Sequence, residues 1–312
     1  MDTYRSLTEI IPLSDSVVTI GTYDGLHRGH QEIVKRVVTY ANATHISSVA
    51  ITFDPHPRNV LNPESELVSL IMNLKDKLAL FSELGVDYAL VIPFTDAIRK
   101  MTANKFLNDI VVKYFSPSQI IIGYDHHFGF HREGSPEFLS KYAKQHCFGI
   151  DVVDAVSDEG ALISSTHIRG LITDGYVRRA SFELGWVYGF QATVVHGVGR
   201  GEKMTFPTAN FIPVEKSQLL PKPGVYLTRG IVDGHTLHGM CNLGVRPTFD
   251  EGEFVMEVHF FEKKVKNLYG RNIRIEFLER IRDEKKFSSE QTLIEQLKQD
   301  KKHCIALLAK YV

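Results

Sequence analysis

The chain has 312 residues, of which 43% are hydrophobic and 23% are charged, with 36 Lys and Arg against 37 Asp and Glu. This length favours two domains, and the composition is that of a protein with hydrophobic cores. A formal net charge of -1 provides no global basic field, so we expect no binding to nucleic acid or to an anionic membrane.

Neither the first residues nor the cysteines indicate export. Residues 1–20 lack the basic start and the long apolar run of a signal peptide, and no later apolar run approaches membrane-spanning length. Cys147, Cys241 and Cys304 are scattered, which suits neither a disulfide framework nor a zinc site. We therefore expect a cytoplasmic protein with reduced thiols and no evident obligate protein partner.

The first half of the sequence alternates short apolar runs with helical stretches. The pattern predicts strands over 16–21, 47–53, 88–92, 119–123 and 151–156, with helices between them over 29–41, 73–84, 102–114 and 136–145. Thr102 is a plausible N-cap. Near-continuous apolar strands separated by helices favour an α/β fold with a parallel sheet covered on both faces, whose ligands bind at the carboxyl ends of the strands.

The pattern changes near Gly185. From Trp186 to about Leu278, short strands alternate with turns rich in Gly and Pro, which favours an antiparallel β-barrel. A C-terminal helix follows over about 289–309. The change of period predicts two domains, 1–184 and 185–312. The expected turns lie at 197–201, 221–224, 233–234, 250–252 and 269–270.

The first predicted strand runs into TYDGLHRGH at 22–30 and then into a helix. Gly25 and Gly29 allow the backbone to approach a ligand, and a helix start offers free N–H groups and a positive dipole end. His27 and His30 are three apart and share one face of the first turn. Two such donors suit a polyphosphate whose leaving pyrophosphate gains charge. The alternative is that one histidine caps the turn and the other packs.

This segment resembles the H-x-G-H motif of the nucleotidyltransferase superfamily, which binds the ATP phosphates. Three further segments narrow the resemblance to the bacterial bifunctional riboflavin kinase/FAD synthetase (FMN adenylyltransferase) family: TFDPHP at 52–57, IIGYDHHFG at 121–129 and SSTHIR at 164–169. The resemblance implies a Rossmann-like nucleotidyltransferase domain that transfers AMP from ATP onto FMN, with Mg²⁺ present. It implies catalytic residues His27, His30 and Arg169, ATP-binding residues Gly21, Thr22, Asp24, Gly25, Gly29, Ser164, Ser165 and Thr166, and flavin-binding residues Phe53, Pro55, His56, Asp125 and Phe128.

Several of these segments have plainer interpretations. Pro55 can stiffen an ordinary turn, Phe128 can fill core instead of stacking on a flavin, and residues 164–166 can simply cap the following helix. His126 stands where the family has an aromatic residue, so flavin contacts can differ here. The histidines at 126, 127 and 131 lack the carboxylate or cysteine spacing that would complete a metal site.

In the second half, FPTAN at 206–210 resembles the riboflavin kinase motif in which Thr208 and Asn210 hold the Mg²⁺ of Mg·ATP. The alternative is an edge strand with a bend.

Further segments follow in the family's order: GVY at 224–226, CNLGVRPTF at 241–249, MEVH at 256–259, LYG at 268–270 and RIRDEKKF at 280–287. They imply a riboflavin kinase β-barrel that phosphorylates riboflavin to FMN. The implied residues are the general base Glu257, the ATP-binding Gly199, Arg200 and Lys203, and the flavin-binding Arg246, Arg282 and Glu284. Glu257, Arg282 and Glu284 can also be solvated surface charges.

The phosphate loop departs from the family. GEKMT at 201–205 stands where the family reads roughly G-R-x-L-G, with Thr205 in place of a glycine and Glu202 in place of a basic residue. Both changes can weaken ATP binding, and Lys203 or Arg200 can compensate. Two alternatives therefore stay open: an FMN adenylyltransferase with an inactive flavin-binding barrel, and a non-catalytic flavin-binding protein. The intact His27, His30 and Arg169 speak against the second.

Overall fold

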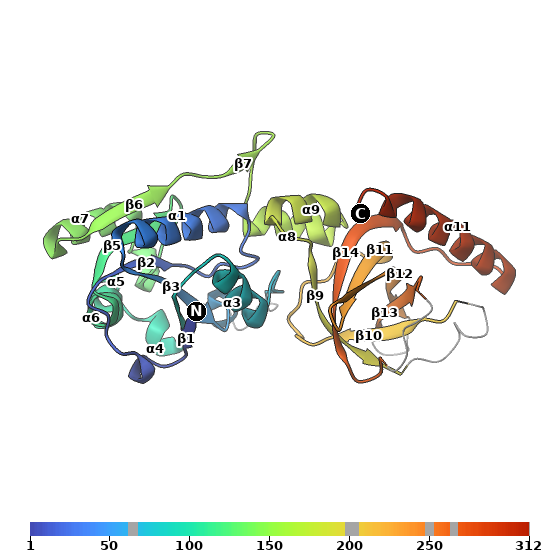
Figure 1. The fold of residues 1–312 in the computed structure, drawn as a ribbon, viewed down its shortest axis with the longest axis horizontal. Helices are drawn as coiled ribbons and strands as arrows, with labels where there is room; N and C mark the ends of the chain where they lie inside the picture. Colours follow the sequence, from blue (N-terminus) through green and yellow to red (C-terminus); the bar gives the residue numbers. More distant parts are fainter. Residues whose placement is uncertain (62–67, 197–205, 247–252, 263–267, 312) are drawn as a thin grey trace. The chain divides into compact units, whose positions relative to one another are not determined.

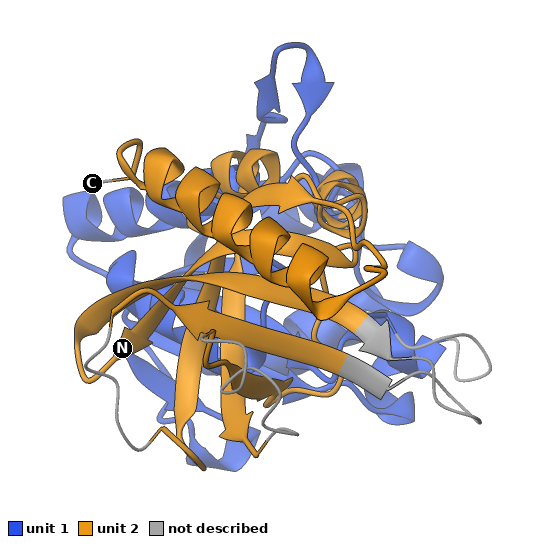
Figure 2. Cartoon of the chain, turned by 90° about the vertical axis from the view of Figure 1, so that its right-hand side faces the viewer, with its two compact units in different colours: residues 1–165 blue, residues 166–312 orange. Residues whose placement is uncertain are grey.

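The computed structural model describes residues 1–61, 68–196, 206–246, 253–262 and 268–311. They form two compact units, Met1–Ser165 and Thr166–Val312, which are coloured separately in Figure 2. Residues 166–184 pack with the second unit, so this division falls earlier than the boundary predicted between residues 184 and 185. Within the described ranges, no helix has the length and apolar character needed to cross a membrane.

A parallel six-stranded sheet forms the centre of the first unit (Figure 1). The strand order is β1-β4-β3-β2-β5-β6, and every neighbouring pair is parallel. The five predicted strands are confirmed; β1 was not expected. The strands are β1 (Asp2–Tyr4), β2 (Ser16–Ile20), β3 (Ser47–Asp54), β4 (Tyr88–Pro93), β5 (Pro117–Gly123) and β6 (Gly149–Val153).

Helices connect these strands. The longer ones are α1 (Arg28–Thr44), α3 (Leu74–Glu83) and α7 (Pro136–His146), and the short ones are α2 (Pro57–Leu61), α4 (Asp96–Arg99), α5 (Ala103–Phe106) and α6 (Lys113–Phe115). The Thr102 side chain accepts a hydrogen bond from the Lys105 N–H, which confirms it as an N-cap. The single helix predicted over 102–114 is interrupted, because a π-helical stretch, Leu107–Val112, separates α5 from α6.

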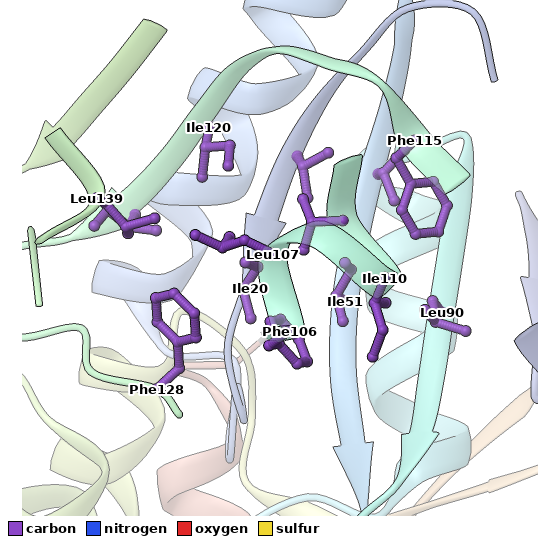
Figure 3. Packing of buried hydrophobic residues seen from close by; sticks show 14 of the residues in the cluster. Ile20, Ile51, Leu90, Phe106, Leu107, Ile110, Phe115, Ile120, Phe128 and Leu139 are labelled. Atoms are coloured by element: carbon purple, nitrogen blue, oxygen red, sulfur yellow. The ribbon is translucent and has the colours of Figure 1, made fainter. Parts of the chain in front are cut away.

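Hydrophobic side chains cover both faces of this sheet. On one face, Ile20, Ile51 and Leu90 pack with Phe106 and Ile110 of the helical segment (Figure 3). On the other, Val17 of β2 packs with Ile33 and Val37 of α1. Every residue of β2 is buried, which is why its sequence, SVVTI, does not alternate between apolar and polar residues. Strand β2 is therefore packed on both faces, and the turn that follows it begins from a fixed position.

The second unit is a closed antiparallel barrel with the strand order β10-β13-β12-β11-β14-β9, as predicted. Asp233 and Gly234 both have positive φ and form the tight turn between β11 and β12, at one of the expected positions. The strands are β9 (Gly189–Val195), β10 (Ala209–Pro213), β11 (Gly224–Val232), β12 (His235–Arg246), β13 (Glu253–Phe260) and β14 (Asn272–Arg282).

The described helices that accompany the barrel are α8 (Ser165–Thr173), α9 (Val177–Leu184) and α11 (Glu290–Leu308). The predicted C-terminal helix is confirmed, and Ser289 forms a capping box with Thr292 at its start. Buried Cys304 of α11 packs with Phe206, Leu227, Met240 and Leu278, so α11 shares a hydrophobic core with the barrel. A short hairpin, β7 (Ser157–Asp158) and β8 (Ala161–Leu162), precedes α8.

Candidate active sites

Residues 21–27 form the turn between β2 and α1 at the carboxyl edge of the sheet, and the H-x-G-H motif begins at the N-cap of α1 and continues into its first turn. Gly25 has φ 77°, a conformation that favours glycine. A Cβ on Gly29 would lie 3.2 Å from two ring atoms of His27, so a side chain there would press on that imidazole. Gly21 and Thr22, which follow β2, are half-buried in the same turn. Glycine therefore suits the turn at position 25, and at position 29 it leaves room for the His27 ring.

His27 and His30 lie together at the start of α1. His27 is the N-cap, and its Nδ1 accepts a hydrogen bond from the His30 backbone N–H at 3.4 Å. The two rings are stacked with centroids 3.7 Å apart, and the Tyr23 ring meets His30 edge-on at 5.2 Å. Because Nδ1 of His27 accepts, its proton resides on Nε2, which is the donor that remains for a ligand. His30 Nδ1 is buried and has no hydrogen-bond partner among the described residues.

Both imidazoles are held neutral. Burial lowers the pKa of His27 from 6.5 to about 4. Burial, with smaller contributions from His27 and Lys77, lowers the pKa of His30 well below its ordinary value. Neutral imidazoles at a helix N-terminus can donate hydrogen bonds to phosphate oxygens.

Acidification provides a test of this burial. The pKa of His27 is lower in the folded protein than in the unfolded chain, so its stabilising contribution is present above pH 6.5 and is lost as the pH falls towards 4. Between pH 7 and pH 5 this group alone should remove on the order of 2 kcal/mol from the free energy of unfolding of the first unit. We expect His27→Gln to remove that part of the pH dependence.

The measurement is urea unfolding, followed by circular dichroism, at pH 7 and pH 5. His45→Asn is the matched control, because His45 is an exposed histidine at the other end of α1, in a left-handed conformation that asparagine also adopts. A His27→Gln variant that loses as much stability on acidification as the wild type would show that His27 is not buried as described.

Lys77, which the sequence reasoning missed, joins this turn to the sheet. Its Nζ donates to the Thr22 carbonyl oxygen at 2.6 Å and lies 3.4 Å from Thr52 Oγ1. Burial lowers the pKa of Lys77 to about 8, although Asp24 and Asp54 oppose the shift. Asp24 is also buried, and its Oδ1 accepts from the Ile71 and Met72 N–H groups at 3.1 and 3.4 Å. Buried charged side chains, Lys77 and Asp24, therefore fix the backbone of the predicted ATP-binding turn by hydrogen bonds.

The predicted ATP-binding segment at 164–169 begins beside this turn. The Ser165 hydroxyl donates to the Asp24 carbonyl oxygen at 2.9 Å, so this hydroxyl links the two segments within the first unit. Ser164 is half-buried. Thr166 and Arg169 lie on α8 and belong to the second unit, and their predicted contacts with ATP remain predictions.

The predicted flavin residues of the first unit follow β3 and β5. Phe53 packs edge-on against Phe94 at 5.6 Å, and Pro55 and His56 come directly after β3. Asp125 is exposed just beyond β5. Phe128 is 8% exposed and packs against Phe106, so its ring lies largely in the core, as in the plainer interpretation above. The contacts of these residues with a flavin remain predictions.

In the second unit, strand register brings the predicted metal ligand and base together. Glu257 of β13 is directly opposite Asn210 of β10 on one side and Asn242 of β12 on the other. The next row, Phe211, Met256 and Leu243, is buried inside the barrel, so the polar row faces outward. Side chains directly opposite each other have Cβ atoms about 5 Å apart. Asn242 belongs to the CNLGVRPTF segment but was not predicted as a site residue.

The remaining predicted flavin residues of the barrel have different surroundings. Arg282 donates from Nε and Nη2 to the buried carboxylate of Asp300 on α11, at 2.7 to 3.0 Å. This pair ties β14 to α11, so the guanidinium has a structural partner. Glu284 lies against Gly244 of β12, close enough that a Cβ on that glycine would clash with its carboxylate.

The remaining predicted residues of the barrel lie in or beside the phosphate loop and at the end of β12. Gly199, Arg200 and Lys203, and the altered loop at 201–205, lie outside the described residues. Arg246 ends β12 opposite Glu253, and only its backbone is described. Thr208 is half-buried immediately before β10. The predictions for these side chains therefore stand on sequence alone.

The donor set of the barrel site fits Mg²⁺. Thr208, Asn210 and Glu257 offer oxygen atoms, the ligands that this cation prefers, and phosphate oxygens commonly complete its coordination. Among the described residues, no group of three or more His, Cys, Asp or Glu side chains could hold a metal alone.

Comparison with known proteins assigns a class to each part of the chain. The family model for FAD synthetase matches residues 11–167, and that for riboflavin kinase matches residues 184–308. The chain thus joins a domain of the FAD synthetase class to one of the riboflavin kinase class.

A relative in Listeria monocytogenes, a bifunctional riboflavin kinase/FMN adenylyltransferase, is 34% identical over 95% of this chain and 93% of its own. A Bacillus subtilis relative of the same name is 31% identical over 93% and 92%. The chain belongs to the bifunctional riboflavin kinase/FMN adenylyltransferase family, as its motifs predicted.

A solved structure supports the fold along the whole chain. The crystal structure of a macrolide-efflux protein from Streptococcus pneumoniae superposes with a TM-score of 0.88 at 31% identity, over 96% of this chain and 97% of that one. Both units are therefore present in that protein in the same order.

Proposed function

We propose that this chain makes FAD from riboflavin in two steps, first phosphorylating riboflavin to FMN in the barrel and then transferring AMP from ATP onto FMN in the α/β domain. The observation that carries the proposal is that each half of the chain matches one of the two family models. Each half also contains polar side chains suited to its reaction: the stacked His27 and His30 in the first, and Asn210 opposite Glu257 in the second. We keep the domain limits 1–184 and 185–312, with ATP, riboflavin and FMN as small-molecule substrates.

In the adenylylation step, a phosphate oxygen of FMN attacks the α-phosphorus of ATP, and the bond from that phosphorus to the bridging oxygen of pyrophosphate breaks. The attacking oxygen is already anionic, so no side chain needs to remove a proton. His27 donates from Nε2, and His30 lies stacked beside it at 3.7 Å, where the helix N-terminus also favours negative charge. Catalysis then consists of positioning and charge stabilisation.

In the phosphorylation step, the ribityl 5′-oxygen of riboflavin attacks the γ-phosphorus of ATP, and ADP leaves. Glu257 accepts the proton of that hydroxyl as the new bond forms. Thr208 and Asn210 would hold Mg²⁺, which would neutralise charge on the triphosphate. Asn210 lies directly opposite Glu257, so the predicted metal ligand and the predicted base share one row of the barrel.

The test is incubation of the purified protein with riboflavin, ATP and Mg²⁺, with FMN and FAD separated by chromatography. We expect both products, and we expect EDTA to prevent the formation of both. FAD formed only when FMN is supplied would instead indicate an inactive barrel, an outcome that Glu202 and Thr205 make worth testing. Flavin binding without either product would overturn the proposal and favour a non-catalytic flavin-binding protein.

A further inference from the structure

His259, two residues after Glu257 on β13, is a buried polar residue to which the mechanism above gives no role. It is 6% exposed. Its side chain lies on the same outward face as Glu257, because side chains two residues apart in a strand share a face. The Phe206 ring packs edge-on against it, with ring centroids 5.1 Å apart. The side chain is therefore enclosed next to the FPTAN segment.

Two hydrogen bonds fix the tautomer of His259. Its Nδ1 lies 2.9 Å from the Pro207 carbonyl oxygen, which can only accept, so Nδ1 carries the proton. Its Nε2 lies 3.2 Å from Nζ of Lys301 on α11, and an ammonium can only donate, so Nε2 is the acceptor. Burial lowers the pKa of His259, which is consistent with a neutral ring between these two partners.

The hydrogen bonds from Lys301 through His259 to Pro207 bear on catalysis because Pro207 directly precedes the predicted metal ligand Thr208. Thr208 follows Pro207, and the ladder between β10 and β13 begins only at Ala209, opposite Val258. The segment that carries Thr208 therefore approaches the ladder from outside it. His259 contacts this segment twice, through the Phe206 ring and the Pro207 carbonyl.

The geometry points to His259 as a positioning residue for the metal-nucleotide site, with Lys301 holding its ring in the one tautomer that can donate to Pro207. This inference rests on the proposed kinase function. The proposed site then includes not only the predicted metal ligands Thr208 and Asn210 but also Lys301 of α11. Lys301 is itself held in place, because its Nζ lies over the Phe261 ring, 5.5 Å from the centroid. Supporting residues of this kind commonly contribute about 10- to 100-fold to metal affinity or activity.

The experiment titrates the full-length protein with ADP by calorimetry, once with Mg²⁺ and once with EDTA. For the barrel site, we expect His259→Leu to weaken Mg·ADP binding by about 10- to 100-fold and to change ADP binding in EDTA far less. His259→Asn places an amide donor near the Nδ1 position, and it should recover most of the Mg·ADP affinity. Nucleotide bound by the first unit is the internal reference, since it should not change.

Lys301→Met tests the second link without altering the histidine. We expect it to weaken Mg·ADP binding less than His259→Leu and to raise KM for Mg·ATP in FMN formation more than it lowers kcat. Lys302→Met, at the exposed neighbouring position on α11, should behave as the wild type. If His259→Leu does not fold, then Lys301→Met and His259→Asn decide the question.

The inference is overturned if His259→Leu binds Mg·ADP as the wild type does, if it loses binding equally with Mg²⁺ and with EDTA, or if Lys301→Met matches Lys302→Met. Failure of the proposed function would look different, because the wild type itself would then form no FMN.

Discussion

Replacing His30 by alanine is expected to abolish FAD formation from FMN and ATP, while FMN formation from riboflavin stays at the wild-type level. The substitution removes one of two stacked imidazoles at the start of α1 and leaves the second unit unchanged. Loss of one preorganised donor to a transition-state anion typically lowers kcat by about 100- to 1000-fold. The measurement is the rate of each product, determined separately with riboflavin and with FMN as the substrate.

The loss of stability caused by removing the His30 ring has to be distinguished from the loss of its hydrogen-bond donor. His30 also meets Tyr23 edge-on, so alanine leaves a cavity, and the melting temperature of each variant should be measured alongside. His30→Gln fills more of the space and retains a donor, so we expect it to keep more activity than His30→Ala. His45→Asn serves again as the control. Equal loss of both products, or undiminished FAD formation, would contradict the assignment of His30 to the first reaction.

Replacing Glu257 by glutamine is expected to have the opposite effect, with FMN formation lost and FAD formation from supplied FMN unchanged. Glutamine keeps the shape of the side chain between Asn210 and Asn242, but it cannot accept the proton of the ribityl hydroxyl. General-base catalysis contributes about 100- to 10,000-fold, and the fall in kcat should lie in that range.

The Glu257→Gln variant needs a control for a change of charge. Glu215→Gln removes an exposed carboxylate in the same unit and should leave both reactions unchanged. Because glutamine can still make hydrogen bonds to its neighbours, KM for riboflavin should move less than kcat. Undiminished FMN formation by Glu257→Gln would remove this residue from the role of base.

Much of the fold could be predicted because the relevant signals are local. The apolar run of β2 and the capping residues Thr102 and Ser289 are visible in a few consecutive residues. The strand β1 was missed because three mostly polar residues carry no periodicity. The π-helical stretch within the predicted helix was missed because it keeps the hydrophobic side chains on the core face.

The sites were harder to predict because they depend on residues brought together from distant segments. Lys77 reaches the ATP loop from α3, and lysine is rarely buried, so nothing in its neighbourhood signals that position. The row formed by Asn210, Glu257 and Asn242 depends on barrel register, which no short motif specifies. The pairing of Arg282, a predicted flavin residue, with Asp300 depends on where α11 packs, and its contact with a flavin stays a prediction.

The central claim is that two separate sites perform consecutive reactions, and mixing two single-site variants tests it most directly. His30→Ala alone should convert riboflavin and ATP to FMN and stop there, while Glu257→Gln alone should make neither product from riboflavin. An equimolar mixture of the two should produce FAD, because FMN released by one variant is the substrate of the other. A mixture that forms no FAD, although each variant retains its remaining activity when assayed alone, would contradict the account.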